Sequence, residues 1–264
     1  PNVILASPTV ARVESRIAPI GIIFASLVVA LTYLGAETAQ TFHSAGYNIA
    51  LHYRQSKTAA QALADKLNGI REKSCEIFAA DLDQLDQIEK LATDTIERFG
   101  SIDTLINNAS SFYPTKIGTA TEQHWNDLIS SNMKAPFFLA QACAPHLSKA
   151  KGCIINIVDI YSEKALANHT IYCMAKAGLN MMTQSLALEL APNVRVNGVS
   201  PGAILWPSEG DSAMPDQQAI LAKVPLARTG EASDIANTAL FLATNAPYIS
   251  GQVIPVDGGR TAGA

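Results

Sequence analysis

The chain has 264 residues, 48% of them apolar, and is long enough to bury a large core. We expect one domain over residues 1–264 rather than two. The formal net charge is −4 and the sequence has no basic stripe, so nucleic acid is not an expected partner. The five histidines and four cysteines lack the spacing of metal ligands, and no metal site is predicted.

The N-terminal segment has a different character from the rest. Residues 17–36 contain no charged side chain and follow Arg12 and Arg16, a pattern that resembles a signal anchor or a short membrane span. Pro19 and Gly21 interrupt this apolar run, and a buried first strand is the favoured interpretation. We therefore expect a cytoplasmic protein with reduced thiols that does not insert into membranes.

From residue 22 onward, short apolar runs alternate with longer amphipathic ones. Strands are predicted at residues 22–32, 47–53, 75–80, 104–107, 153–159, 194–199 and 252–256. Helices are predicted at residues 35–45, 58–68, 85–99, 122–147, 172–190 and 232–244. Ile- and Val-rich strands separated by helices indicate right-handed crossovers. The predicted fold is α/β, a Rossmann-like, doubly wound parallel sheet of about seven strands with helices on both faces. Its ligands should lie beyond the carboxyl ends of the strands.

Two residues of the predicted helix 172–190 form a candidate catalytic pair. Tyr172 and Lys176 are four residues apart, so both side chains lie on one face of the helix. An ammonium group beside a phenol stabilises the phenolate, and the pair can then exchange a proton near neutral pH. Alone the spacing is weak evidence, because a surface helix can carry the same two residues.

A second group of polar residues follows the second and third predicted strands. An acidic residue after the second strand of a dinucleotide-binding fold holds the ribose 2′-hydroxyl, whereas a cation accommodates a 2′-phosphate. Arg54 stands there, with Ser56 as a hydroxyl donor, and favours NADPH over NADH. Asp81 follows the third strand, where it can accept from an adenine amino group or cap the next helix.

Ordered motifs along residues 35–259 resemble the short-chain dehydrogenase/reductase family. They are Asn107-Asn108-Ala109, Asn132, Tyr172 with Lys176, Pro201-Gly202 and Val256-Asp257-Gly258-Gly259. The resemblance implies that Tyr172 transfers the proton and that Lys176 lowers its pKa and holds the nicotinamide ribose, while Asn132 supports a water relay. The predicted cofactor site comprises Gly35, Arg54, Ser56, Asp81, Leu82, Asn108, Ala109, Ser110, Lys176, Pro201 and Gly202.

Within that family the chain is most similar to the pteridine reductases of bacterial type. Most members have a serine thirteen residues before the tyrosine, and this chain has Asp159. A carboxylate suits a ring C=N better than a ketone, because it can hydrogen-bond ring and amino N–H groups. The resemblance also implies that Phe112 stacks a pterin against the nicotinamide and that Ser110 contacts both ligands. The predicted substrate site comprises Ser110, Phe112, Asp159, Tyr172, Leu205 and Trp206.

The glycine-rich phosphate loop of the family is missing from its expected place. The family has three loop glycines before the first helix, and residues 27–35 read LVVALTYLG, in which only Gly35 matches. A β-branched Val cannot cheaply adopt the positive φ of a loop glycine. Residues 1–34 match the family poorly, and we expect weaker NADPH binding than in a member with the intact loop.

Three functions remain open at this stage. The first is an NADPH-dependent pteridine reductase that acts on a dihydropterin or dihydrofolate, with Tyr172 and Asp159 as proton donors. The second is another short-chain reductase that acts on a carbonyl or acyl substrate, and the third is a non-catalytic member with an impaired cofactor loop. The resemblance also implies a homo-oligomer, either a tetramer or a dimer.

Overall fold

A seven-stranded parallel sheet forms the centre of the protein. The computed structural model describes residues 22–26, 33–204 and 217–263. The strands are β1 (Ile22–Ser26), β2 (Asn48–Tyr53), β3 (Cys75–Ala79), β4 (Thr104–Asn107), β5 (Cys153–Ile157), β6 (Arg195–Pro201) and β7 (Val253–Val256). Their spatial order is β3-β2-β1-β4-β5-β6-β7, and every neighbouring pair is parallel. The predicted Rossmann-like fold is confirmed.

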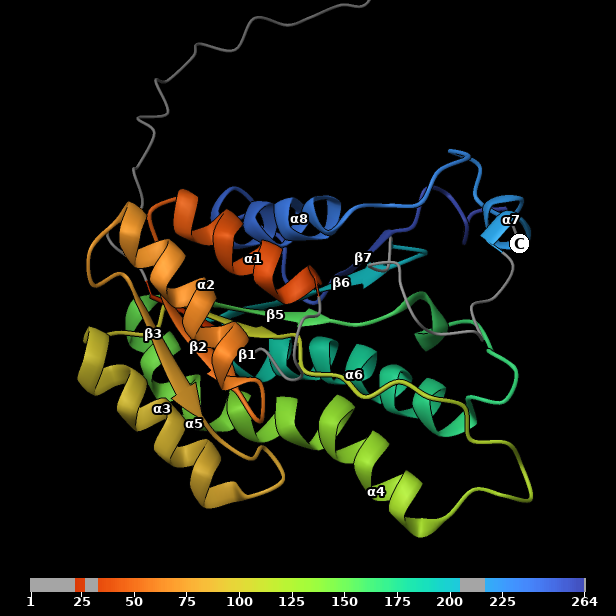
Figure 1. The fold of residues 1–264 in the computed structure, drawn as a ribbon, viewed down its shortest axis with the longest axis horizontal. Coiled ribbons are helices and arrows are strands. Elements are labelled where there is room, and N and C mark those ends of the chain that lie inside the picture. The colour runs from red at the N-terminus through yellow and green to blue at the C-terminus, as the bar shows by residue number, and fades with distance from the viewer. Residues whose placement is uncertain (1–21, 27–32, 205–216, 264) are drawn as a thin grey trace, which may run out of the picture.

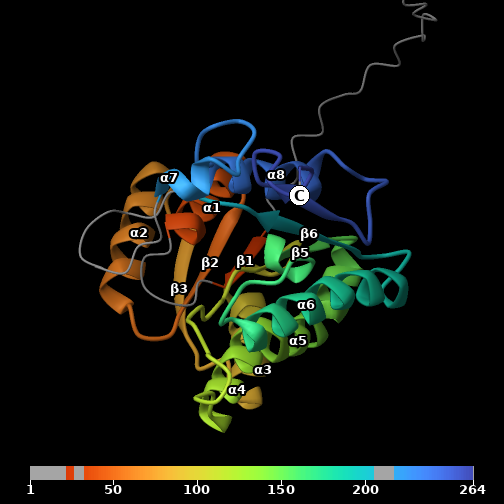
Figure 2. The same cartoon turned by 90° about the vertical axis from the view of Figure 1, so that its right-hand side faces the viewer.

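Helices cover both faces of this sheet (Figures 1 and 2). On one face lie α1 (Tyr33–Ser44), α2 (Lys57–Ile70) and α8 (Ala232–Thr244). On the other lie α3 (Leu85–Phe99), α4 (Glu122–Ile129), α5 (Ala135–Ala150) and α6 (Thr170–Glu189). A short helix α7 (Gln217–Leu221) precedes α8. No helix among the described residues is long and apolar enough to cross a membrane.

Each face has its own apolar core because successive strand residues point to opposite faces. In β4, Leu105 packs with α3, α5 and α6, while its neighbour Ile106 packs with α1, α2 and α8. Ile154 and Ile155 of β5 divide in the same way, and every residue of β4 and β5 is buried. Burial on both faces explains why most residues of these strands are apolar, with Thr104, Asn107 and Asn156 as buried polar exceptions.

A chain of polar side chains crosses the centre of the sheet. Asn107 Nδ2 donates to Asn156 Oδ1 at 2.8 Å, and Asn156 Nδ2 donates to Thr183 Oγ1 at 2.9 Å. The three residues are at most 2% exposed. These hydrogen bonds fix the positions of β4, β5 and α6 relative to one another, because a displacement would leave a buried polar group unpaired. They therefore hold in place the strand ends from which the candidate site projects.

The predicted single helix 122–147 contains an irregular turn. Helices α4 and α5 are joined by a π-helical turn, η1 (Ser130–Lys134), in which the Ala135 N–H donates to the Ser130 carbonyl five residues earlier. Pro136 has no N–H to offer the carbonyl of Asn132, four residues before it. The sequence pattern shows apolar periodicity across this turn, and only the hydrogen bonding reveals the interruption.

Replacement of Asn156 by alanine should lower the free energy of unfolding by about 2–3 kcal/mol, because it leaves the Asn107 side-chain amide unpaired in the core. Thr183 also loses the hydrogen bond that it accepts and keeps only the one that it donates to the Leu179 carbonyl. Chemical denaturation of the purified protein measures this change. Gln184→Ala is the matched control, since Gln184 is exposed on α6 next to Thr183 and should cost less than about 0.5 kcal/mol. Equal stability of the two variants would contradict a structural role for the chain.

Candidate active site

The predicted catalytic residues converge beyond the carboxyl ends of β4, β5 and β6. Asp159 follows β5 by two residues and starts a 3₁₀ turn, η2 (Ile160–Ser162). The hydroxyl of Tyr172, in the first turns of α6, donates to Asp159 Oδ2 at 2.7 Å. Lys176 Nζ donates to the Ile157 carbonyl at 2.9 Å and lies 5.8 Å from the centre of the Tyr172 ring. The structure thus brings Asp159, Tyr172 and Lys176 into one cluster.

Burial controls the charges of this cluster. Tyr172 is 3% exposed and Lys176 is 2% exposed. Burial lowers the pKa of Lys176 to about 8, partly offset by the negative charge of Asp159. Burial also raises the pKa of Asp159, against the hydrogen bonds from Tyr161 and Tyr172 and the charge of Lys176. Burial thus disfavours the charged forms of both Asp159 and Lys176, while the opposite charge of each group stabilises that of the other.

The sequence predicts that Lys176 lowers the pKa of Tyr172, and the structure shows that this prediction is wrong. Burial, followed by the charge and hydrogen bond of Asp159, raises the pKa of Tyr172 well above its usual value. The ammonium of Lys176 is turned to the Ile157 carbonyl and does not outweigh these effects. Tyr172 is therefore a protonated phenol at neutral pH, the form that a proton donor requires.

Asn132 lies in the π-helical turn and is fully buried. Its Nδ2 donates to the Ser111 carbonyl at 2.9 Å and to the Leu128 carbonyl at 3.0 Å, while its Oδ1 has no partner among the described residues. The side chain thus ties the loop after β4 to the helix.

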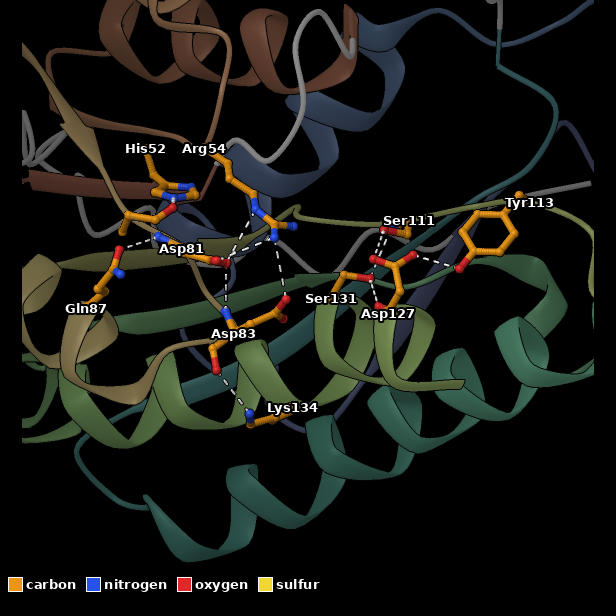
Figure 3. Close-up of polar contacts among 11 residues, drawn as sticks. His52, Arg54, Asp81, Asp83, Gln87, Ser111, Tyr113, Asp127, Ser131 and Lys134 are labelled. Carbon is orange, nitrogen blue, oxygen red and sulfur yellow. Dashed lines mark hydrogen bonds and ion pairs between the residues drawn. The ribbon is translucent and has the colours of Figure 1, made fainter. Parts of the chain in front are cut away.

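The loop after β4 presents Phe112 beside Tyr172. The Phe112 ring is 50% exposed, packs edge-on against Tyr172 with centroids 4.8 Å apart, and stacks on His169 at the same distance. The hydroxyl of Tyr113 donates to Asp127 Oδ2 at 2.8 Å (Figure 3). These contacts fix the residues on both sides of Phe112 and leave its ring partly open to a ligand.

Ser111 strengthens the same loop. Its N–H donates to Ser131 Oγ at 3.2 Å, and Ser131 Oγ in turn donates to the Asp127 carbonyl at 2.8 Å. Figure 3 shows this group of Ser111, Asp127 and Ser131 beside the Tyr113 contact. Ser110, predicted to contact cofactor and substrate, is partly buried at the start of the loop. The sequence predicted that this loop contributes to the site, but it did not predict the contacts of Ser111, Tyr113, Asp127 and Ser131 that hold the loop in place.

The predicted adenosine end of the site lies beyond β2 and β3. Arg54 is placed between two carboxylates, with Nε 3.4 Å from Asp81 Oδ1 and Nη2 3.6 Å from Asp83 Oδ2 (Figure 3). All three side chains are about one third exposed or more. The structure brings Arg54 and Asp81 together, a contact that the sequence did not predict. The guanidinium is paired with acidic groups, and a 2′-phosphate must compete with them.

Two further contacts fix this end of the site. Lys134, in the π-helical turn, donates to the Asp83 carbonyl at 3.2 Å, and Gln87 accepts from the Asp81 N–H at 2.7 Å (Figure 3). The same π-helical turn thus contacts the loop after β3 through Lys134 and the loop after β4 through Asn132. Both ends of the predicted cofactor groove share one support.

Several polar groups are suited to a bound dinucleotide. The buried Asn108 Nδ2 has no partner among the described residues. Ser56 is the N-cap of α2, yet its hydroxyl makes no capping hydrogen bond, so both the hydroxyl and the helix N-terminus can receive an anion. Lys176 adds a buried cation at the other end. These groups fit a phosphorylated dinucleotide that runs along the strand ends.

The other predicted residues have structural surroundings of their own. Leu82 and Ala109 are each 5% exposed, and Gly35 is buried in α1. Gly202 follows the end of β6 at Pro201, and a side chain there would meet Asp257 at 2.5 Å. Two predicted substrate residues, Leu205 and Trp206, lie outside the described residues, as does the loop 27–32.

The geometry agrees with the comparisons to known proteins. Residues 30–261 match the family model described as Enoyl-(Acyl carrier protein) reductase. The chain belongs to the short-chain dehydrogenase/reductase family and is an oxidoreductase.

Relatives with different reactions are similar to the chain at nearly equal levels. It is 35% identical over 233 residues to the 3-oxoacyl-(acyl-carrier-protein) reductase FabG of Staphylococcus aureus, covering 86% of this chain and 93% of the relative. It is 34% identical over 267 residues to pteridine reductase 1 of Leishmania tarentolae, covering 86% and 92%. An uncharacterized oxidoreductase, YmfI of Bacillus subtilis, is 30% identical over 231 residues, covering 86% and 93%. Overall identity therefore does not separate an acyl substrate from a pterin.

Sequence reasoning missed the residues that support this site. Tyr113 and Asp127 are fourteen residues apart and meet only because the loop after β4 folds over α4. His169 precedes α6 and reaches Phe112 across the site. No local spacing indicates such contacts. The one available signal was the row of hydroxyl and aromatic residues around Phe112.

The pKa of Tyr172 can be tested in the free protein. The ultraviolet difference titration between wild type and Tyr172→Phe should show no phenolate from this residue below the ordinary tyrosine pKa of 10.0. Asp159→Asn should lower the pH at which the phenolate forms, because it removes a negative charge while burial still raises the pKa. A Tyr172 phenolate near neutral pH in the wild type would contradict the shift.

Proposed function

We propose that this protein is an NADPH-dependent pteridine reductase that reduces a C=N bond of a dihydropterin or dihydrofolate. The observation that carries the proposal is the 2.7 Å hydrogen bond from the Tyr172 hydroxyl to Asp159. A carbonyl reductase needs a hydroxyl donor at the position of Asp159, to hold the substrate oxygen. A carboxylate in that position recognises N–H groups instead, and a pterin presents ring and amino N–H groups side by side.

Asp159 and Tyr172 both take part in the protonation of the substrate. The phenol of Tyr172 donates a proton to the ring nitrogen of the C=N bond as the neighbouring carbon is reduced. Asp159 holds the substrate by accepting from its N–H groups. It then takes up a proton from solvent and passes it to the Tyr172 phenolate. Burial raises the pKa of both residues, so Tyr172 stays protonated at neutral pH and Asp159 has a higher affinity for a proton than an exposed carboxylate.

Other residues orient the two ligands. Phe112 offers a half-exposed ring beside Tyr172, a platform for a flat heteroaromatic substrate. Lys176, Asn108 and Ser110 hold the nicotinamide half of NADPH, and Arg54, Ser56 and Asp81 hold the adenosine half. NADPH supplies the hydride. Asn132 supports a water relay that brings protons from solvent toward Lys176 and Tyr172.

A second candidate is an acyl reductase of the same fold. The similarity to FabG, whose name states that it reduces a 3-oxoacyl group on acyl-carrier protein, favours it. Against it stands Asp159, which repels a carbonyl oxygen when ionised. The half-exposed ring of Phe112 also suits a flat ring better than a linear chain.

We further propose a homo-oligomer, formed through the outer faces of α4, α5 and α6. Exposed apolar side chains gather on these helices: Trp125, Phe137, Met174, Met181 and Leu188. Large apolar side chains on neighbouring solvent-facing helices are typical of a subunit contact. Sedimentation of the purified protein tests whether it is a dimer or a tetramer.

The substrate class follows from one assay. NADPH oxidation is measured with dihydrobiopterin, dihydrofolate and a 3-oxoacyl thioester at equal concentrations. We expect turnover of at least one pterin and a kcat/KM for the thioester about a hundredfold lower, because Asp159 recognises N–H groups. Reduction of the thioester alone would establish the acyl reductase instead, and no oxidation with any substrate would favour a non-catalytic protein.

Replacement of Asp159 tests the mechanism. Asp159→Ala should lower kcat for the pterin by about 10² or more if this carboxylate takes part in protonation. Glu163→Ala is the control, because this carboxylate follows the same turn and contacts Asn180 rather than Tyr172. Unchanged turnover in Asp159→Ala would remove Asp159 from the mechanism.

The contacts of Arg54 at the adenosine end of the site predict how substitutions there change the affinity for NADPH and NADH. Calorimetry should show that Arg54→Ala weakens NADPH about tenfold more than NADH, because only NADPH carries the 2′-phosphate. Asp83→Asn should strengthen NADPH a few-fold, since the phosphate then competes with one carboxylate fewer. Equal losses for both cofactors in Arg54→Ala would place the 2′-phosphate elsewhere.

A further inference from the structure

The end of the described chain is held against the loop that carries Asp159. Arg260 Nη2 donates to the Tyr161 hydroxyl at 3.0 Å, and its guanidinium carbon lies 5.7 Å from the centre of the Tyr161 ring. Lys164 Nζ donates to the carbonyl of Arg260 at 3.5 Å and to that of Thr261 at 3.3 Å. These contacts join segments almost one hundred residues apart.

The turn that presents Arg260 is itself tightly fixed. Asp257 Oδ1 accepts from the Gly259 N–H at 2.9 Å, and Oδ2 accepts from the Thr261 N–H at 2.7 Å. Gly258 and Gly259 have φ of 64° and 85°, which favour glycine. Gly202 at the end of β6 lets the backbone of Asp257 approach closely. Arg260 is therefore held by the sheet and not by a loose tail.

Tyr161 links Arg260 to the Asp159 carboxylate. The Tyr161 N–H donates to Asp159 Oδ1 at 2.8 Å, while Asp159 Oδ2 accepts from the Tyr172 hydroxyl. The Ser162 N–H also donates to the Asp159 carbonyl at 2.9 Å. One carboxylate oxygen is thus held by the turn that Arg260 contacts, and the other is aimed at the proton donor.

We propose that Arg260 is a positioning residue for Asp159, which acts through Tyr161 to keep one carboxylate oxygen on the Tyr161 N–H and the other on the Tyr172 hydroxyl. The chemical part assigned to Asp159 rests on the proposed function. The positional part rests on the contacts alone. Arg260 touches neither Asp159 nor Tyr172 through a hydrogen bond, so its effect on the reaction is indirect.

The charge of Arg260 adds a measurable signature. Four groups influence the ionisation of Asp159: the Tyr172 hydroxyl and Lys176 on α6, the N–H of Tyr161 on η2, and Arg260 on the C-terminal turn. All four lower the pKa of Asp159 against the effect of burial. Loss of Arg260 removes a positive charge and loosens the Tyr161 contact, so the pKa of Asp159 must rise.

The first experiment uses the free protein and needs no activity. The carboxyl of Asp159 is titrated by isotope-edited infrared difference spectroscopy against Asp159→Asn, in wild type, Arg260→Ala, Arg260→Lys and Tyr161→Phe. We expect a higher pKa in Arg260→Ala and a smaller rise in Tyr161→Phe and Arg260→Lys. Arg228→Ala is the matched control, since its guanidinium contacts Thr229 and Asp234. An unchanged Asp159 pKa in Tyr161→Phe would overturn the proposal, because any rise in Arg260→Ala would then come from the lost charge alone.

The second experiment is a double-mutant cycle in pterin reduction. Arg260→Ala should lower kcat about tenfold and leave the KM for NADPH within twofold, because only the acid is misplaced. The double variant with Tyr161→Phe should be no slower than Arg260→Ala, since both residues act on one contact. Multiplied losses would show that Arg260 acts independently of Tyr161 and overturn the proposal. If wild type reduces no pterin, the proposed function fails, while the titration still decides the position of Asp159.

Discussion

The site depends on the burial of three ionisable side chains at one point. Asp159, Tyr172 and Lys176 lie where β5 ends and α6 begins, in surroundings that disfavour charge. Each group keeps its role only because its neighbours limit the cost of burial: the Ile157 carbonyl accepts from Lys176, and Asp159 accepts from Tyr172. A shift in any of them changes the proton affinity of the others. The backbone that holds them must therefore be rigid.

The fold supplies that rigidity through polar contacts as well as through apolar packing. The chain from Asn107 through Asn156 to Thr183 fixes the two central strands to α6. The π-helical turn then connects the loops after β3 and β4, through Lys134 and Asn132. An irregular turn in a long helix is costly unless it serves such contacts. Here it places one amide group under the substrate loop and one ammonium group under the adenosine loop.

Membership of the reductase family leaves the substrate to be decided by a few side chains. Relatives that act on acyl groups and on pterins are about equally similar to this chain over most of its length. Similarity of this extent reflects the sheet and the cofactor groove, which such enzymes share. In the proposed function, the choice between a ketone and a ring C=N rests on Asp159 and on the ring of Phe112, so the proposal gives these two positions more weight than the overall identity.

The sequence by itself determined the order of strands and helices, because burial on both faces gives short strands rich in Ile and Val, while the helices show periodic patterns. It also determined that Tyr172 and Lys176 lie on one face of α6, since four residues make about one helical turn. The tertiary structure alone decided the direction of the Tyr172 pKa shift, which depends on burial and on the orientation of Lys176. It alone brought Arg260 to Tyr161 and Asp83 to Arg54, because contacts between distant segments depend on how the loops fold and leave no periodic trace.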